Sequence, residues 1–237
     1  YNDGRIILSD MGSQYFSMAV TSTNHVIIIY YDENESRLVM KYSKDPVTGS
    51  NPTAAVEWNT SDIVFPEYVG NYVSMVLDQY DGIHISAFDS GDSDLAYIYV
   101  PSYLTKKSEK KMVHYTVDQS GAVGNWTQIK INSEGKPVIA YTNATENGQR
   151  DAIKLAIAEG KVVASGTAST IGTIKAGIDS KTKYTTGDWE YMTVPAITPP
   201  QGGDSKFQNV CLDFDSAGRP VVGYLGSNIE FGKALDE

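Results

Sequence analysis

Carboxylates on short loops are the residues of this chain best placed to do chemistry. Asp213 and Asp215 lie in the stretch Asp213-x-Asp215-x-x-Gly218, and a second acidic cluster occupies positions 89–94. Carboxylate oxygens gathered in this way are the ligands that calcium prefers. Neither stretch follows the twelve-residue calcium-binding loop, and acidic turn residues are ordinary in a chain of net charge -10. We therefore predict no metal site and no cofactor, with calcium at Asp213 and Asp215 as the alternative.

The residues that a glycosidase or a metalloenzyme would need are scattered. Sialidase-like hydrolysis requires an arginine cluster and a nucleophile with its acid around an oxocarbenium-like transition state. The chain has four arginines, which are Arg5, Arg37, Arg150 and Arg219. Its three histidines lack the spacing of a metal-binding motif, and they are His25, His84 and His114. We predict no catalytic residues and favour a protein that is not an enzyme.

Composition excludes several classes of partner. A net charge of -10 and a pI near 4.7 repel the phosphate backbone, so nucleic acid is not an expected partner. The longest apolar run, Val26 to Tyr30, is too short to cross a bilayer, and no transmembrane segment is predicted.

The single cysteine, Cys211, has apolar neighbours and is predicted to be a small core residue. Four sequons, which would carry glycans in an exported eukaryotic protein or arise by chance, lie at Asn34, Asn59, Asn125 and Asn143.

Internal repeats supply the elements that would position these residues. Ser17–Thr21 aligns with Ser74–Asp78 at a spacing of 57 positions. A second spacing, of 83 positions, relates residues 131–141 to residues 214–224. Repeated strand–turn–strand units of this size are the signature of a β-propeller or a β-solenoid. Four units can be aligned in this way, and one plan describes all of them.

Each unit reads as four strands joined by tight turns. Asn132-Ser-Glu-Gly135 and Asp215-Ser-Ala-Gly218 place an Asx residue first and glycine where φ must be positive, as in a tight hairpin. The strand after such a turn is continuously apolar and is expected to be covered on both faces. No sustained helical periodicity occurs, so little helix is expected. The outer strands are expected at Arg5–Ser9, Val56–Val64, Met112–Val117 and Trp189–Val194.

These strands predict an all-β fold, a β-propeller of about four four-stranded blades in one domain. The blades are expected at about residues 1–43, 56–100, 111–158 and 187–237. Residues 159–186 are either an insertion or a degenerate blade. The chain is then either part of a larger propeller or a four- or five-bladed ring. It opens on Tyr1 without a leader, which predicts a processed form or a fragment.

The motif Asp-x-x-Gly-x-Pro-Val-Val-Gly-Tyr, which ends at Tyr224, resembles the repeat of bacterial exported β-propellers with sialidase-like blades. The resemblance covers all four units, closely in the third and fourth and loosely in the first two, where Gly82 lacks the following proline. It implies an extracytoplasmic protein, secreted, periplasmic or held at the cell surface as a lipoprotein. The Asp-box of sialidases, Ser-x-Asp-x-Gly-x-x-Trp, is missing, which argues against sialidase activity.

One repeated polar position marks a candidate binding site. Asp32, Asp89 and Asn143 each follow the inner apolar strand, so they should ring one mouth of the propeller. Short polar side chains there could bind a polar ligand or simply end the strands. Tyr141 and Tyr224 end the same strand in two units, and we expect them to pack between blades rather than to stack on sugars.

Repeats without a reactive constellation favour a binding protein. We expect a non-catalytic extracytoplasmic propeller that serves as a binding or scaffolding module for a protein partner in a surface or periplasmic assembly. The alternative is a carbohydrate-active propeller, a lectin or a glycoside hydrolase, with its sites on loops or on further blades. Its partner would be a glycan instead of a protein.

Overall fold

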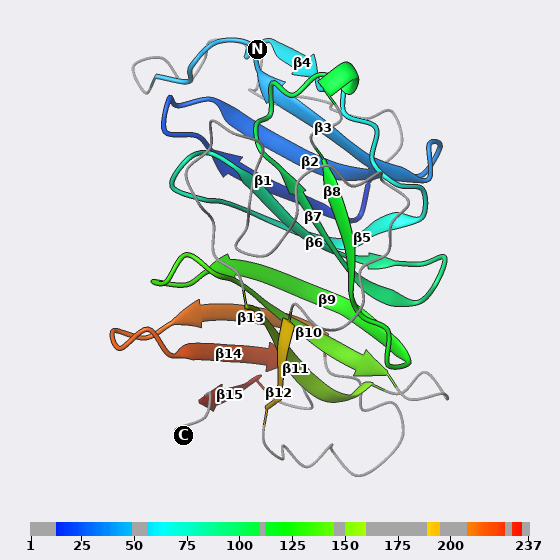
Figure 1. The fold of residues 1–237 in the computed structure, drawn as a ribbon, viewed down its shortest axis with the longest axis vertical. Helices are drawn as coiled ribbons and strands as arrows, with labels where there is room; N and C mark the ends of the chain where they lie inside the picture. Colours follow the sequence, from blue (N-terminus) through cyan, green and yellow to red (C-terminus); the bar gives the residue numbers. More distant parts are fainter. Residues whose placement is uncertain are drawn as a thin grey trace.

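The computed structural model describes residues 13–48, 56–109, 112–144, 150–159, 189–194, 208–225 and 229–233. These residues form four antiparallel sheets that follow one another in chain order (Figure 1). The described residues contain one short 3₁₀ helix, Lys107–Glu109, which confirms the prediction of little helix. No helix in this part of the chain has the length and apolarity needed to cross a membrane.

Three of the sheets have four strands and the fourth has three described strands. The first sheet consists of β1 (Phe16–Val20), β2 (Val26–Asp32), β3 (Arg37–Ser43) and β4 (Trp58–Thr60). The second consists of β5 (Val69–Leu77), β6 (Ile83–Asp89), β7 (Asp94–Val100) and β8 (Val113–Asp118). The third consists of β9 (Ala122–Ile131), β10 (Pro137–Ala144), β11 (Arg150–Ala158) and β12 (Trp189–Thr193). The fourth consists of β13 (Gln208–Phe214), β14 (Pro220–Leu225) and β15 (Ile229–Lys233).

The outer strands belong to different sheets from those that the sequence repeat predicts. The predicted blade of residues 56–100 begins with the strand that becomes β4, but β4 pairs with β3 of the first sheet. In the same way β8 pairs with β7, and β12 pairs with β11. A repeat has no intrinsic starting point, whereas the backbone groups along a strand edge must find partners. The predicted strand Arg5–Ser9 and nearly all of residues 159–186 lie outside the described residues.

The hairpins between the first two strands of each sheet share one turn geometry. The side chain of the first turn residue accepts a hydrogen bond from the backbone N–H four residues later, at Thr21, Asp78, Asn132 and Asp215. The residue just before that donor has a positive φ, which is 79° at Gly135, 79° at Gly218, 62° at Asn24 and 61° at Asp81. The predicted glycine turns are therefore confirmed. Asn and Asp replace glycine in the first two sheets because they tolerate the left-handed conformation.

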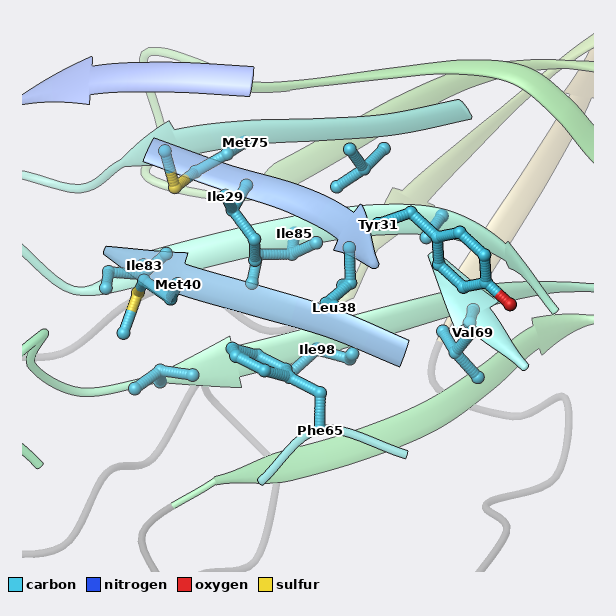
Figure 2. Packing of buried hydrophobic residues seen from close by; sticks show 14 of the residues in the cluster. Ile29, Tyr31, Leu38, Met40, Phe65, Val69, Met75, Ile83, Ile85 and Ile98 are labelled. Atoms are coloured by element: carbon cyan, nitrogen blue, oxygen red, sulfur yellow. The ribbon is translucent and has the colours of Figure 1, made fainter. Parts of the chain in front are cut away.

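Three apolar cores hold the sheets together face to face. The first lies between the first and second sheets, where Ile29 and Leu38 meet Ile85 and Ile98 (Figure 2). The second core joins the second and third sheets, and the third core joins the third and fourth. A middle strand covered on both faces is buried throughout, as at every residue of β7. Figure 1 places the first and fourth sheets at opposite ends of the molecule.

The single cysteine does not belong to a core. Cys211 is exposed, contrary to the prediction from its apolar neighbours. Side chains alternate along a strand, and β13 turns Val210 and Leu212 toward the third sheet. Cys211 therefore lies on the opposite face of β13. Neighbours in the sequence could not reveal which of the two faces of the strand is covered.

Candidate functional site

The first strands of the four sheets lie side by side, β1 next to β5, β5 next to β9, and β9 next to β13. A side-chain acceptor on each of the first three strands receives a hydrogen bond from a backbone N–H of the next strand. These pairs are Ser17 Oγ with Met75 N (3.0 Å), Ser74 Oγ with Ile129 N (3.2 Å), and Gln128 Oε1 with Leu212 N. The four strands thus form a continuous inner wall.

The inner wall is irregular near the start of its strands. The pairing of β5 with β6 shifts register between Val69 and Ser74, and the pairings of β9 and β13 shift at the same place. One non-glycine residue in each irregular stretch has a left-handed backbone, with φ of 56° at Tyr72, 52° at Trp126 and 51° at Asn209. Large aromatic residues rarely adopt this conformation. Such bulges and strained residues concentrate at functional sites, where they redirect a side chain.

Three aromatic rings form a row across the inner wall at this level. Tyr15, just before β1, Tyr72 of β5 and Trp126 of β9 occupy equivalent positions of the repeat and are each half-buried. The ring centroids of Tyr15 and Tyr72 lie 4.6 Å apart, and those of Tyr72 and Trp126 lie 4.8 Å apart. The ring of Phe88 meets Tyr72 edge-on at 6.3 Å. We call Tyr15, Tyr72 and Trp126 the aromatic row.

The aromatic row lies at the end of the sheets where the sequence places the polar mouth residues. Asp89 pairs with Val69 and Asn143 pairs with Val123, three residues before Tyr72 and Trp126 respectively. The aromatic row is absent from the sequence prediction. Extending the repeat alignment two residues before Ser17 would reveal it, because Tyr15 and Tyr72 share the spacing of 57.

Two of the predicted mouth residues cap turns. Oδ1 of Asp32 accepts a hydrogen bond from the backbone N–H of Asn34 at 2.9 Å, and Oδ1 of Asp89 accepts one from Gly91 at 2.9 Å. Each carboxylate thereby ends its strand, which is the structural role that the sequence leaves open for it. Their role as ligand-binding residues stays a prediction.

Asn143 differs from its two counterparts. Its Oδ1 is buried and has no hydrogen-bond partner among the described residues. A buried polar atom without a partner costs free energy, so this amide is available to a polar group that reaches it. Of the three predicted residues, Asn143 has the most capacity left for a ligand.

A charged cluster joins the second and third sheets beside this mouth. The Tyr141 hydroxyl donates a hydrogen bond to Asp118 Oδ2 at 2.7 Å, and Lys154 Nζ lies 3.1 Å from the same oxygen. Burial alone would raise the pKa of Asp118, but hydrogen bonds from Ser120 and Tyr141, together with the charge of Lys154, hold it below its ordinary value. Tyr141 is fully buried, which confirms that it packs between blades.

A second polar network lies inside the second sheet. His84 is fully buried, with Nε2 3.1 Å from Asp78 Oδ2 and Nδ1 2.7 Å from the Tyr97 hydroxyl. Burial lowers the pKa of His84, although Asp78 opposes that shift. A neutral imidazole that donates from Nε2 and accepts at Nδ1 satisfies all three groups. This histidine is therefore a structural residue and not a surface ligand.

The calcium candidates do not converge. Oδ2 of Asp215 is 2.7 Å from an Arg219 nitrogen, and its Oδ1 accepts backbone hydrogen bonds within the turn. The Asp213 side chain is largely exposed and lies 3.8 Å from Lys130. Within the described ranges, no group of three or more potential metal ligands occurs. Asp215 thus works as a turn cap in this structure.

Comparison with solved structures supports the assignment of the fold, whereas the sequence comparisons find no match. Neither a protein-family model nor a curated protein sequence matches this chain. Among solved structures, it is similar to a GH43 glycoside hydrolase engineered to display endo-xylanase and exo-arabinofuranosidase activity, with 14% identity and a TM-score of 0.52. It is also similar to a bifunctional GH43-CE protein of Bacteroides eggerthii, with 13% identity and a TM-score of 0.51. The chain is a β-propeller. The sheets packed face to face are its blades.

The two similar structures are much longer than this chain. The likeness covers 90% of this chain but 35% of the first protein, and 95% of this chain but 25% of the second. At this level of identity the likeness concerns the fold and not the activity.

Proposed function

We propose that this propeller binds saccharides at the mouth formed by the aromatic row, Asn143 and the turns that Asp32 and Asp89 cap. The observation that carries the proposal is the aromatic row, in which two half-buried rings, Tyr72 and Trp126, lie at the same bulge of successive inner strands. An extracytoplasmic location, where polysaccharides are encountered, belongs to the proposal. The carbohydrate activities of the two similar structures support it.

The chemistry of the mouth suits a neutral sugar. A flat aromatic ring offers a wide apolar face with little conformational entropy to lose, and the C–H faces of pyranose and furanose rings can stack on it. The polar groups nearby, the Asn143 amide and the Asp32 and Asp89 carboxylates, accept hydrogen bonds from hydroxyl groups. An anionic sugar would be repelled by these carboxylates and by the net charge of -10.

Binding without hydrolysis fits the residues around the aromatic row. Glycoside hydrolysis generally needs two carboxyl groups about 5 to 9.5 Å apart beside the scissile bond. The inner strands carry no Asp or Glu at residues 13–17, 69–74, 122–128 and 208–211, and the two carboxylates placed at the mouth, Asp32 and Asp89, each accept backbone hydrogen bonds as turn caps. A lectin-like role therefore agrees better with this part of the site than a hydrolytic one.

Isothermal titration calorimetry with neutral xylo- and arabino-oligosaccharides tests the proposal. The substitutions Trp126→Ala and Tyr72→Ala should each weaken binding about tenfold or more, which corresponds to ~1.4 kcal/mol. Tyr80→Ala is the matched control, because Tyr80 is an exposed tyrosine at the opposite end of the same sheet. A wild-type chain that binds no neutral oligosaccharide, or equal binding by all three variants, would overturn the proposal.

A further inference from the structure

The inner strand of each later sheet buries the same positions against the sheet before it. These positions are Val73 and Met75 of β5, Thr127 and Ile129 of β9, and Val210 and Leu212 of β13. All six are exposed by 7% or less. We call this the leading face of a sheet, and the face turned toward the next sheet its trailing face.

The leading face of the first sheet is uncovered. Its equivalent residues, Phe16 and Met18, are 68% and 61% exposed, and Val20 on the same face of β1 is 54% exposed. The equivalence is set by strand pairing, since Met18 lies opposite Ile28 as Met75 lies opposite Ile85. Large apolar residues exposed at two positions that are buried in every other sheet, Phe16 and Met18, mark an interface and not an ordinary surface.

The trailing face of the fourth sheet is the face that a following sheet would cover. In the first three sheets, an acceptor on this face of the inner strand binds the next strand's N–H, at Ser17, Ser74 and Gln128. Cys211 holds the equivalent place in β13, opposite Gly223 as Ser74 lies opposite Ser86, and it is exposed. In the part of the chain that the structure describes, one leading face and one trailing face are therefore left unused.

We propose that the leading face of the first sheet binds the trailing face of the fourth sheet of a second copy of this chain. The contact would repeat the interface already formed three times within the chain, with Met18 of one copy in the place of Met75 and Cys211 of the other in the place of Ser17. The first and fourth sheets lie at opposite ends of the molecule (Figure 1). The contact is head to tail, and it generates rings or open chains. It does not depend on the saccharide proposal.

Cross-linking through the natural cysteine tests this geometry. In the chain, the Ser17 side chain lies 3.0 Å from the Met75 backbone nitrogen, so cysteines at the equivalent positions of two copies would be neighbours. Under mild oxidation, Met18→Cys should give disulfide-linked dimers and longer species on a non-reducing gel. Leu104→Cys is the matched control, because Leu104 is 57% exposed but lies in the second sheet's loop after β7.

Two further variants make the result decisive. Adding Cys211→Ser to Met18→Cys should abolish the linked species, whereas persistent links would mean that β1 meets β1 and would overturn the head-to-tail contact. If Met18→Cys gives no more linked species than Leu104→Cys, the head-to-tail contact is overturned as well.

Sedimentation velocity should show the unmodified chain associating as its concentration rises, and Phe16→Glu should abolish this association. A monomer at every concentration up to several hundred micromolar would refute the proposal.

Discussion

The hydroxyl of Tyr141 in the third sheet donates a 2.7 Å hydrogen bond to Oδ2 of Asp118 in the second sheet. Both side chains are buried, so this bond joins two blades where water does not compete for either group. Tyr141→Phe should lower the free energy of unfolding by about 1–3 kcal/mol, because a buried carboxylate loses a donor. Urea denaturation would measure the loss. Tyr80→Phe, at an exposed tyrosine, should change it little, and an equal effect of both variants would contradict the assignment.

The pKa of Asp118 predicts a loss of stability in acid. Hydrogen bonds and Lys154 outweigh burial and hold the folded pKa below the ordinary value of about 4, so the unfolded chain takes up the proton first. The contribution of Asp118 to stability is complete above pH ~4 and disappears as the pH falls through the lowered folded value. Urea unfolding between pH 6 and pH 2.5 should show a shallower pH dependence for Asp118→Asn than for the wild type. Asp213→Asn, at an exposed carboxylate, is the control and should keep the wild-type slope.

His84 predicts a second pH dependence in a higher range. Burial lowers its folded pKa below the ordinary value of about 6.5, so the unfolded chain binds the proton more readily. The free energy of unfolding should therefore be greatest above pH ~6.5 and should fall as the pH decreases below that value. Thermal or urea unfolding from pH 8 to pH 5 would record it. His25→Gln, at a partly exposed histidine, should keep this dependence, and a His84→Gln variant with an unchanged slope would refute it.

The turn at Gly218 predicts a stability cost for any branched side chain. Its φ of 79° is a conformation that a β-branched residue adopts only with strain, and a Cβ there would lie 3.2 Å from Ser133 Oγ. Gly218→Val should lower the free energy of unfolding by about 1–3 kcal/mol. Ala217→Val, one residue earlier at an exposed position of the same turn, should cost much less. Similar losses for the two variants would show that the left-handed backbone is not the cause.

Much of the fold could be predicted from local patterns. The glycine turns at Gly135 and Gly218, the continuously apolar second strands and the four-fold repeat all follow from short-range backbone preferences and from alternation. The grouping of β4 could not be predicted, because a repeat does not say which neighbouring strand edge will be paired. The exposure of Cys211 could not be predicted for the same reason: the alternation in β13 is visible in the sequence, but the sheet that covers one of its faces is not.

The candidate site also has one part that the sequence predicts and another that depends on how the sheets pack. The sequence alone determined that Asp32, Asp89 and Asn143 occupy one repeated position, since equal spacing in equal units puts them at equal places. Only the tertiary structure decided that the two carboxylates cap turns, that Tyr15, Tyr72 and Trp126 meet as a row, and that Phe16 and Met18 are left uncovered. These outcomes depend on how one sheet packs on the next, and contacts between residues more than fifty positions apart are set by the packing of whole sheets rather than by local preference.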